Sequence, residues 1–451
     1  MLKVKLPWAE IAKGARRSTG HRSRNDNFTG RPSFLNSKAA SQRVKALPVP
    51  SGSPGRQLTP VGYRPIWRDL SQTDGGRQQA IAAVRAALRT GAGLDRLDRL
   101  KVLSHTDKNT VSPSAIAFAV DAPTGLGLAI KAFPLFAPVF YDDVAISSRR
   151  PRMSPDDQQI HAYALHNTAL VYESCVYANA IPDLDLTPHV VQPLGSLTLG
   201  VPSQTWLGNQ LLDALAANRV VPSRFQADMV GMHLIVTERV SSSVPLAKLL
   251  ETAFEDETRS LLFQLIYTIH VMNQNEVVHH DLHFNNVLVD MTPAEAAFEY
   301  EVVGQRFEVP VLAGKLMLFD WDRAYAPRHC GDNALLHHVS CAGESACNSF
   351  SSKYDLMVAL GMVAMALADN AVLFGVDHRP EATAFVKECL QDEFMPDYNA
   401  FRRGTLDSSS YRPCRHSGPG SPCFAWPANA PHDVLSAQQA LELPYFDSFR
   451  V

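Results

Sequence analysis

The feature that most constrains the fold is the segment 277–289, which reads VVHHDLHFNNVLV. It follows a stretch with the apolar spacing of a buried helix, 257–273, and it ends in a strand-like aliphatic run. Asp281 and Asn286 therefore lie five residues apart on a loop between a helix and a strand. A carboxylate and an amide are thus expected to share one short loop.

Three more charged residues stand on predicted elements. Lys131 is the only charged residue in the strand-like run 126–133, and Glu173 lies in the helical stretch 161–180. Asp320 ends the strand-like run KLMLF. Because strand-like segments dominate the first half and helical spacing the second, we predict an α+β fold.

Periodicity predicts further elements over most of the chain. Helices are expected at 78–90, 246–250, 354–367 and 435–443, and strands at 115–120, 190–191, 233–237 and 287–289. We expect the stretch 196–230 to be irregular and 403–431 to be a loop rich in Pro, Gly, Ser and Cys.

Phosphoryl transfer from ATP uses the residue types just described. One carboxylate orients the acceptor hydroxyl, an amide and a second carboxylate hold Mg²⁺, and a lysine held by a glutamate fixes the phosphates. The residues available for these roles are Asp281, Asn286, Asp320, Lys131 and Glu173. Their types and order indicate ATP-dependent phosphoryl transfer.

The ordered set resembles the signature motifs of the eukaryotic-like protein kinase superfamily. The run LAIK, 128–131, is similar to the strand that carries the phosphate-binding lysine. HHDL, 279–282, with Asn286 resembles the catalytic loop, and FDWD, 319–322, stands at the metal-binding Asp-Phe-Gly position. The resemblance spans roughly residues 98–446.

This resemblance implies a two-lobed protein-kinase-like fold, with a β-rich N-terminal lobe over 66–240 and a helical C-terminal lobe over 241–451. It implies ATP and Mg²⁺ as cofactors and Ser/Thr hydroxyls of protein substrates as acceptors. The backbone of Glu238 and Val240 would contact adenine, since they follow a gatekeeper-like Thr237. Asp355 is expected to brace the catalytic loop.

The resemblance also assigns roles within the site. Asp281 would be catalytic, while Lys131, held by Glu173, would bind the phosphates. Asn286 and Asp320 would be the ligands of Mg²⁺. His283 would hydrogen-bond the γ-phosphate, or else would only pack the loop.

Several departures from the kinase pattern keep alternatives open. The segment before Lys131 has no glycine where a glycine-rich phosphate loop is expected, which favours altered ATP cover or a catalytically weak pseudokinase scaffold. His283 and Asp322 are more typical of small-molecule kinases of the aminoglycoside and choline type. His280 replaces an arginine that usually meets a phosphorylated loop, so we expect no strict need for loop phosphorylation.

Other features favour a protein as the acceptor. The long span between Asp320 and Asp355 and the helix predicted near the C-terminus leave room for a substrate-docking segment. The divergent style of the motifs resembles kinases of large DNA viruses.

Charge divides the chain into two parts. Residues 1–65 hold thirteen basic and two acidic residues, a net +11, while the whole chain is −3, so the other 386 residues carry −14. We expect the first part to be a disordered basic arm that can contact nucleic acid or another polyanion, and the acidic body to favour basic protein substrates.

Composition narrows the class of protein. With 46% apolar and 19% charged residues, the chain can build a large core, which excludes global disorder. No secretory signal or membrane span is visible, so we expect an intracellular protein of the nucleus, cytoplasm or virion.

Cysteines and histidines outside the kinase-like motifs have separate interpretations. Cys330 and the neighbouring histidines and cysteines form a weak zinc candidate without a C-x2–4-C pair, and free thiols are the alternative. His233 and His270 are expected to be satisfied core histidines.

Overall fold

The computed structural model describes residues 66–69, 75–90, 101–105, 115–121, 126–136, 155–184, 187–200, 206–217, 220–221, 229–240, 242–282, 286–291, 296–333, 351–374, 377–390, 413–414, 424–425 and 434–451. The arm 1–65 and the glycine-free segment 106–114 lie outside them. Within these ranges no helix is both long and apolar enough to cross a membrane.

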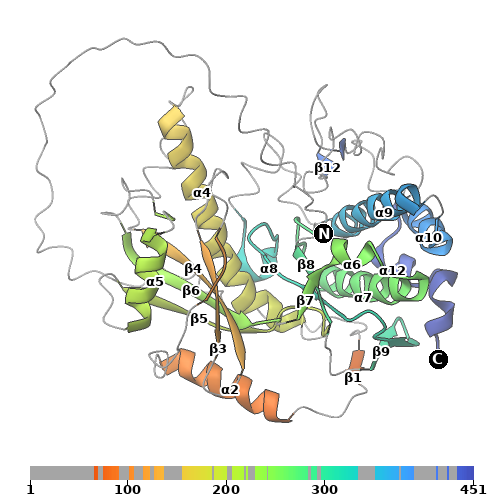
Figure 1. Ribbon diagram of the computed structural model, residues 1–451, viewed down its shortest axis with the longest axis horizontal. Coiled ribbons are helices and arrows are strands. Elements are labelled where there is room, and N and C mark those ends of the chain that lie inside the picture. The colour runs from red at the N-terminus through yellow and green to blue at the C-terminus, as the bar shows by residue number, and fades with distance from the viewer. Residues whose placement is uncertain are drawn as a thin grey trace, which may run out of the picture. The chain divides into compact units, whose positions relative to one another are not determined.

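The largest sheet has five strands in the order β2-β3-β4-β6-β5, and every neighbouring pair is antiparallel. Their bounds are Lys101–His105, Ile116–Asp121, Gly127–Phe136, Met229–Glu238 and Pro193–Gly200 in that order. The strand that carries Lys131 is therefore the middle strand of the sheet, paired on both sides (Figure 1).

The two faces of β4 alternate as the period of a strand requires. Leu128 and Ile130 are buried against the helices on one face, and Lys131 is only partly buried and faces the other side. The helices packed on the first face are α2 (Gly75–Thr90) and α5 (Trp206–Ala217). The second face meets α4 (Pro155–Cys175), whose last turn continues as the π-helix η3 (Val176–Ala180).

Helices dominate the second half of the described chain. They are α6 (Leu246–Leu250), α7 (Glu255–Gln274), α9 (Tyr354–Phe374), α10 (Pro380–Leu390), α12 (Ala437–Leu441) and the 3₁₀ helix η10 (Pro444–Phe449). Helix α7 is buried almost all round, as its sequence predicts, and Phe263 packs against the rings of Tyr300, Phe307 and Phe446 at 5.1, 5.0 and 5.2 Å.

Two small antiparallel sheets complete this half. One has the order β11-β8-β7, with bounds Lys315–Leu318, Val287–Asp290 and Ser243–Pro245. The other has the order β1-β9-β10, with bounds Ile66–Asp69, Ala297–Val302 and Gln305–Pro310. Leu318 pairs with Val287, so the residues just before β8 and just after β11 lie at the same edge.

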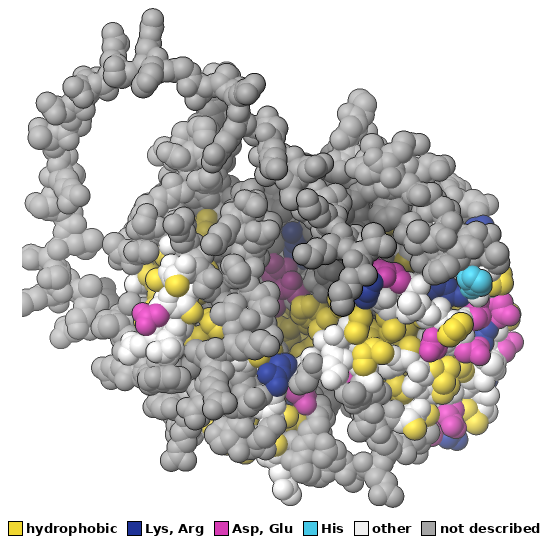
Figure 2. All heavy atoms as spheres, in the orientation of Figure 1, with side chains coloured by type: hydrophobic (Ala, Val, Ile, Leu, Met, Phe, Trp, Pro, Cys, Tyr) yellow, Lys and Arg dark blue, Asp and Glu magenta, His cyan; other side chains and the backbone are white. Residues whose placement is uncertain are grey.

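The surface of the helical half is chemically mixed. Figure 2 shows apolar, acidic and basic described side chains interspersed on this face, at the right of the view. The described side chains therefore present no patch of one charge on that face.

The predicted α+β class is confirmed as a mixed fold with small antiparallel sheets. The helix expected at 246–250 has exactly those bounds in α6, but the helix expected at 161–180 begins six residues earlier, at Pro155. The prediction that 196–230 is irregular is wrong, because β5 and α5 lie there. Val190–Val191 is also not a strand, since Val190 forms only an isolated bridge with Leu318.

Candidate functional site

Lys131 is the centre of a three-residue ion-pair cluster. Its Nζ donates a hydrogen bond to Glu173 Oε2 at 2.6 Å and another to Asp320 Oδ1 at 2.7 Å. The Glu173 side chain is 2% exposed, and its other oxygen accepts from the backbone N–H of Trp321 at 3.3 Å. The structure therefore brings together three of the residues that the sequence singled out, from β4, α4 and the end of β11.

The pKa values of the three side chains in this cluster are shifted in different ways. Burial disfavours the charged form of Lys131, but Asp320 and Glu173 outweigh it and hold the lysine pKa well above its usual value. Burial likewise opposes the charged form of Asp320, and Lys131 overcomes it, so this carboxyl has a lowered pKa. Burial raises the pKa of Glu173 to about 7.

A further carboxylate, Asp322, lies two residues beyond Asp320. Burial, reinforced by the charge of Asp320, raises the pKa of Asp322 well above its usual value. Its Oδ1 is buried and accepts no hydrogen bond from the described residues. The carboxylates at this site therefore carry more negative charge than Lys131 can balance.

Asp281 and Asn286 form the second part of the site. The Asn286 side-chain amide donates to the Asp281 carbonyl at 3.0 Å and approaches Asp281 Oδ2 at 3.4 Å. The Asn286 carbonyl in turn accepts from the N–H of Phe319 at 3.2 Å. This backbone bond fastens the loop to the strand end that carries Asp320.

Asp355 anchors the loop that carries Asp281, as the sequence predicts. It lies in the first turn of α9 and is 2% exposed. Its two carboxylate oxygens accept the backbone N–H groups of His279 at 2.6 Å and His280 at 2.9 Å. His280 has a φ of 61°, a left-handed conformation that a non-glycine residue adopts only when surrounding contacts impose it.

The chain after β11 contains a second residue with a left-handed backbone. Asp320, two residues beyond the end of β11, has a φ of 68°. His279 is packed over Trp321, with ring centroids 4.5 Å apart, and its Nε2 lies 3.0 Å from the carbonyl oxygen of Phe319. These contacts turn Asp320 out of the strand direction and toward Lys131.

Arg323 is a site residue that the sequence analysis missed. Its Nε lies 3.5 Å from Asp281 Oδ2, and its side chain is 14% exposed. The basic residue after FDWD was the available signal. Its partner could not be identified from the sequence, because the contact joins a loop and a turn 42 positions apart.

The remaining predicted site residues have different outcomes. Glu238 ends β6, and its N–H donates to the carbonyl of Gln192 at 2.9 Å. The Val240 carbonyl accepts from the Ser243 hydroxyl at 3.1 Å. These contacts place both residues at the end of β6, and His283 lies outside the described ranges.

The residues predicted as a zinc site or as core histidines have the following surroundings. The described residues contain no cluster of three metal-ligating His, Cys, Asp or Glu side chains. His233 is satisfied by Ser174 and Thr198 at 2.7 and 2.8 Å, as expected. The expectation for His270 is wrong, because its buried Nε2 has no hydrogen-bond partner among the residues that the structure describes.

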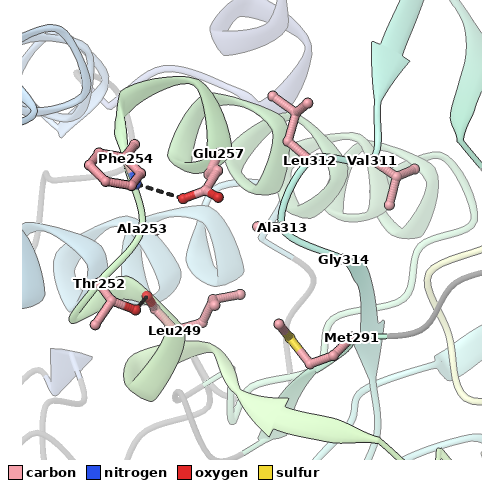
Figure 3. A pocket seen from close by; sticks show the side chains of 10 residues that line it. All are labelled: Leu249, Thr252, Ala253, Phe254, Glu257, Met291, Val311, Leu312, Ala313 and Gly314. Atoms are coloured by element: carbon pink, nitrogen blue, oxygen red, sulfur yellow. Dashed lines mark hydrogen bonds between the residues drawn. The ribbon is translucent and has the colours of Figure 1, made fainter.

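A separate hollow lies away from these residues (Figure 3). It has a volume of about 280 Å³ and is bounded by the loop before α7 and the chain between β10 and β11. Glu257 accepts the backbone N–H of Phe254 at its edge, at 2.7 Å. None of the predicted site residues lines it.

No protein-family model matches the chain, and no curated protein sequence matches it. The assignment of the site therefore rests on its own geometry and chemistry.

Proposed function

We propose that the chain transfers the γ-phosphoryl group of ATP to Ser/Thr hydroxyls of protein substrates, on a two-lobed protein-kinase-like fold. The observation that carries the proposal is the lysine of a central strand bridging a helix glutamate and the aspartate at a strand end, at 2.6 and 2.7 Å. A partly buried lysine kept charged in this way is suited to bind phosphate oxygens.

The residues present fit a divalent metal ion. Asn286, Asp320 and Asp322 offer amide and carboxylate oxygens, which are the ligands that Mg²⁺ prefers. The two cations Lys131 and Arg323 face four carboxylates, and the raised pKa values of Glu173 and Asp322 reflect in part that excess of negative charge. Asn286 and Asp320 would hold Mg²⁺, which when bound neutralises charge on the phosphates.

The protein groups then have distinct tasks. Lys131 neutralises phosphate charge, and Glu173 keeps its ammonium group directed at the site. Asp281 orients the acceptor hydroxyl and accepts its proton, while Asn286 and Arg323 hold Oδ2 of that carboxylate from two sides. Asp355 fixes the loop that presents Asp281.

A small-molecule kinase is the second candidate. Asp322 supports it, because a second acidic residue replaces the glycine of the Asp-Phe-Gly motif and lies buried beside the cluster. An acceptor alcohol would then replace the protein hydroxyl, with the same residues in the same roles.

One assay separates these functions from a pseudokinase. Purified chain is incubated with Mg-ATP and either a generic basic protein or a panel of small alcohols and amines, with Asp281→Asn as the matched control. Transfer to protein that the variant loses supports the proposal, and transfer only to a small acceptor supports the second candidate. Absence of transfer to every acceptor, together with no thermal shift by ATP, would refute both.

A further inference from the structure

The hollow at the start of α7 is bordered by exposed apolar side chains (Figure 3). Among the described residues seven large apolar side chains are exposed, and three of them line this hollow. They are Phe254, Leu312 and Met291, which are 75%, 49% and 42% exposed. Exposed apolar side chains that gather around one depression are typical of an interaction site.

The hollow also contains one carboxylate. Glu257 is the only charged residue among the described residues that line it. Its Oε2 accepts the backbone N–H of Phe254 at 2.7 Å. Its other oxygen accepts no hydrogen bond from the described residues, and Figure 3 shows that oxygen on the side of Ala313. The carboxylate therefore keeps an open acceptor among apolar side chains.

The charge around this carboxylate is negative. The segment 246–259, which includes α6 and the first turn of α7, has four acidic and two basic residues, a net −2. The N-terminus of a helix carries about half of an elementary positive charge, which these acids exceed. The hollow should therefore attract a cation. The sequence outside the arm, which carries −14, adds to that attraction at long range.

The walls of the hollow are held in place by the protein itself. Ser260 Oγ donates to the Pro310 carbonyl at 2.5 Å, and the Gln264 amide donates to the Gly314 carbonyl at 3.2 Å. Gly314 has a φ of 128°, and a Cβ there would lie 2.4 Å from the Asp290 carbonyl oxygen, so only glycine fits. The chain between β10 and β11 is thus fixed against α7 and β8. A preformed site loses little conformational entropy when a partner binds.

We propose that this hollow is a docking site for an arginine side chain in a basic segment of a partner protein. Its volume of about 280 Å³ lies just below the roughly 300–1,000 Å³ of pockets that bind drug-sized molecules, and it suits one long side chain. The guanidinium donates to the open Glu257 oxygen, while the arginine stem packs against Leu249 and Met291. The exposed Phe254 ring offers its face to the same cation. The proposal does not rest on phosphoryl transfer.

The test is methionine-methyl NMR of the full chain. The eleven methionines carry ¹³C at their methyl groups, and Met291→Leu identifies the Met291 signal. The probe is the peptide Gly-Leu-Arg-Leu-Gly, acetylated and amidated at its ends. We expect the Met291 signal to shift most and to saturate, and citrulline in place of the arginine to weaken binding at least about tenfold. An unshifted Met291 signal, or equal binding of the citrulline peptide, would overturn the proposal.

Two variants test whether the carboxylate in the hollow makes this contact. Glu257→Gln keeps an oxygen for the Phe254 N–H but removes the charge, so it should weaken binding of the arginine peptide at least about tenfold. Glu388→Gln is the matched control, because this exposed residue of α10 does not line the hollow, and salt screening should keep its effect below about twofold. Equal weakening by both variants would show only general attraction to an acidic protein, and a Met291 signal that shifts with chain concentration alone would show a second copy in the hollow. Either result would overturn the proposal, and the citrulline comparison on the unmodified chain tests the site even where a variant fails to fold.

Discussion

Asp355→Asn offers the sharpest test of how the loop that carries Asp281 is held. Burial raises the pKa of Asp355 from 3.8 to about 7, despite the two backbone N–H groups that it accepts. The folded state therefore binds this proton more tightly than the unfolded state between those values. Stability of the unmodified chain falls as pH rises through this window and is constant above it, by about 1.4 kcal/mol per pH unit for one proton.

The asparagine variant lacks this titration but loses part of the anchor. Its side-chain oxygen can accept only one of the N–H groups of His279 and His280 comfortably, and an unsatisfied buried donor costs about 1–3 kcal/mol. At pH 5 the variant should thus be less stable than the unmodified chain. Between pH 5 and pH 7 it should recover about 2 kcal/mol relative to that chain, so the two become nearly equal.

The measurement is urea unfolding of both proteins at pH 5, 6, 7 and 8. The difference in unfolding free energy should shrink steadily up to pH 7 and then stay level. Asp377→Asn, on the chain near α10, is a matched control for the loss of a carboxylate that accepts a backbone N–H elsewhere in the chain, because Asp377 Oδ1 accepts the N–H of Arg379 at 2.9 Å. A difference between the Asp355 variant and the unmodified chain that is constant from pH 5 to pH 8 would refute the reasoning.

Three further predictions concern single side chains. Lys131→Met should lower phosphoryl transfer at least about a hundredfold, as loss of a preorganised charge does, and a rate within threefold of the unmodified chain would exclude its role. Arg323→Met should lower phosphoryl transfer, since Asp281 Oδ2 then loses one of the two groups that hold it, while Arg323→Lys should restore part of the rate. His270→Leu should reduce the loss of stability at low pH, measured by urea unfolding. Burial lowers the pKa of His270 from 6.5 to about 4, so the unfolded state binds this proton at a higher pH than the folded state. The unfolding free energy of the unmodified chain therefore falls by about 2 kcal/mol from pH 6.5 to pH 5. An unchanged acid slope would show that His270 does not contribute.

The lysine cluster was predictable because local patterns fix its elements. Alternating burial sets β4, and with it the side of the sheet on which Lys131 lies, while helical spacing sets α4 around Glu173. Asp320 follows from the end of a short aliphatic strand. Each of these signals depends on neighbours in sequence and therefore gives the elements, while the pairing of Lys131 with Glu173 was implied only by the resemblance to protein kinases.

The errors arose where a signal was present but weak, or where the contact is long-range. β5 reads PLGSLTLG, and its glycines mask an alternating pattern. The β9–β10 hairpin turns at Val303 and Gly304, whose φ values of 50° and 78° fit a type I′ turn that the pair Val-Gly signals only faintly. Arg323 beside Asp281 depends on how a loop meets a strand end, which no local pattern encodes.

The central claim is that Lys131 binds the phosphates of ATP beside Asp320. An ATP analogue with a reactive acyl phosphate transfers its acyl group to the amine that lies nearest the phosphates, and peptide mapping identifies that lysine. We expect Lys131 to be the main labelled lysine, excess Mg-ATP to protect it, and Asp320→Asn to weaken this protection. Equal labelling of other lysines, or labelling of Lys131 that Mg-ATP does not reduce, would contradict the claim.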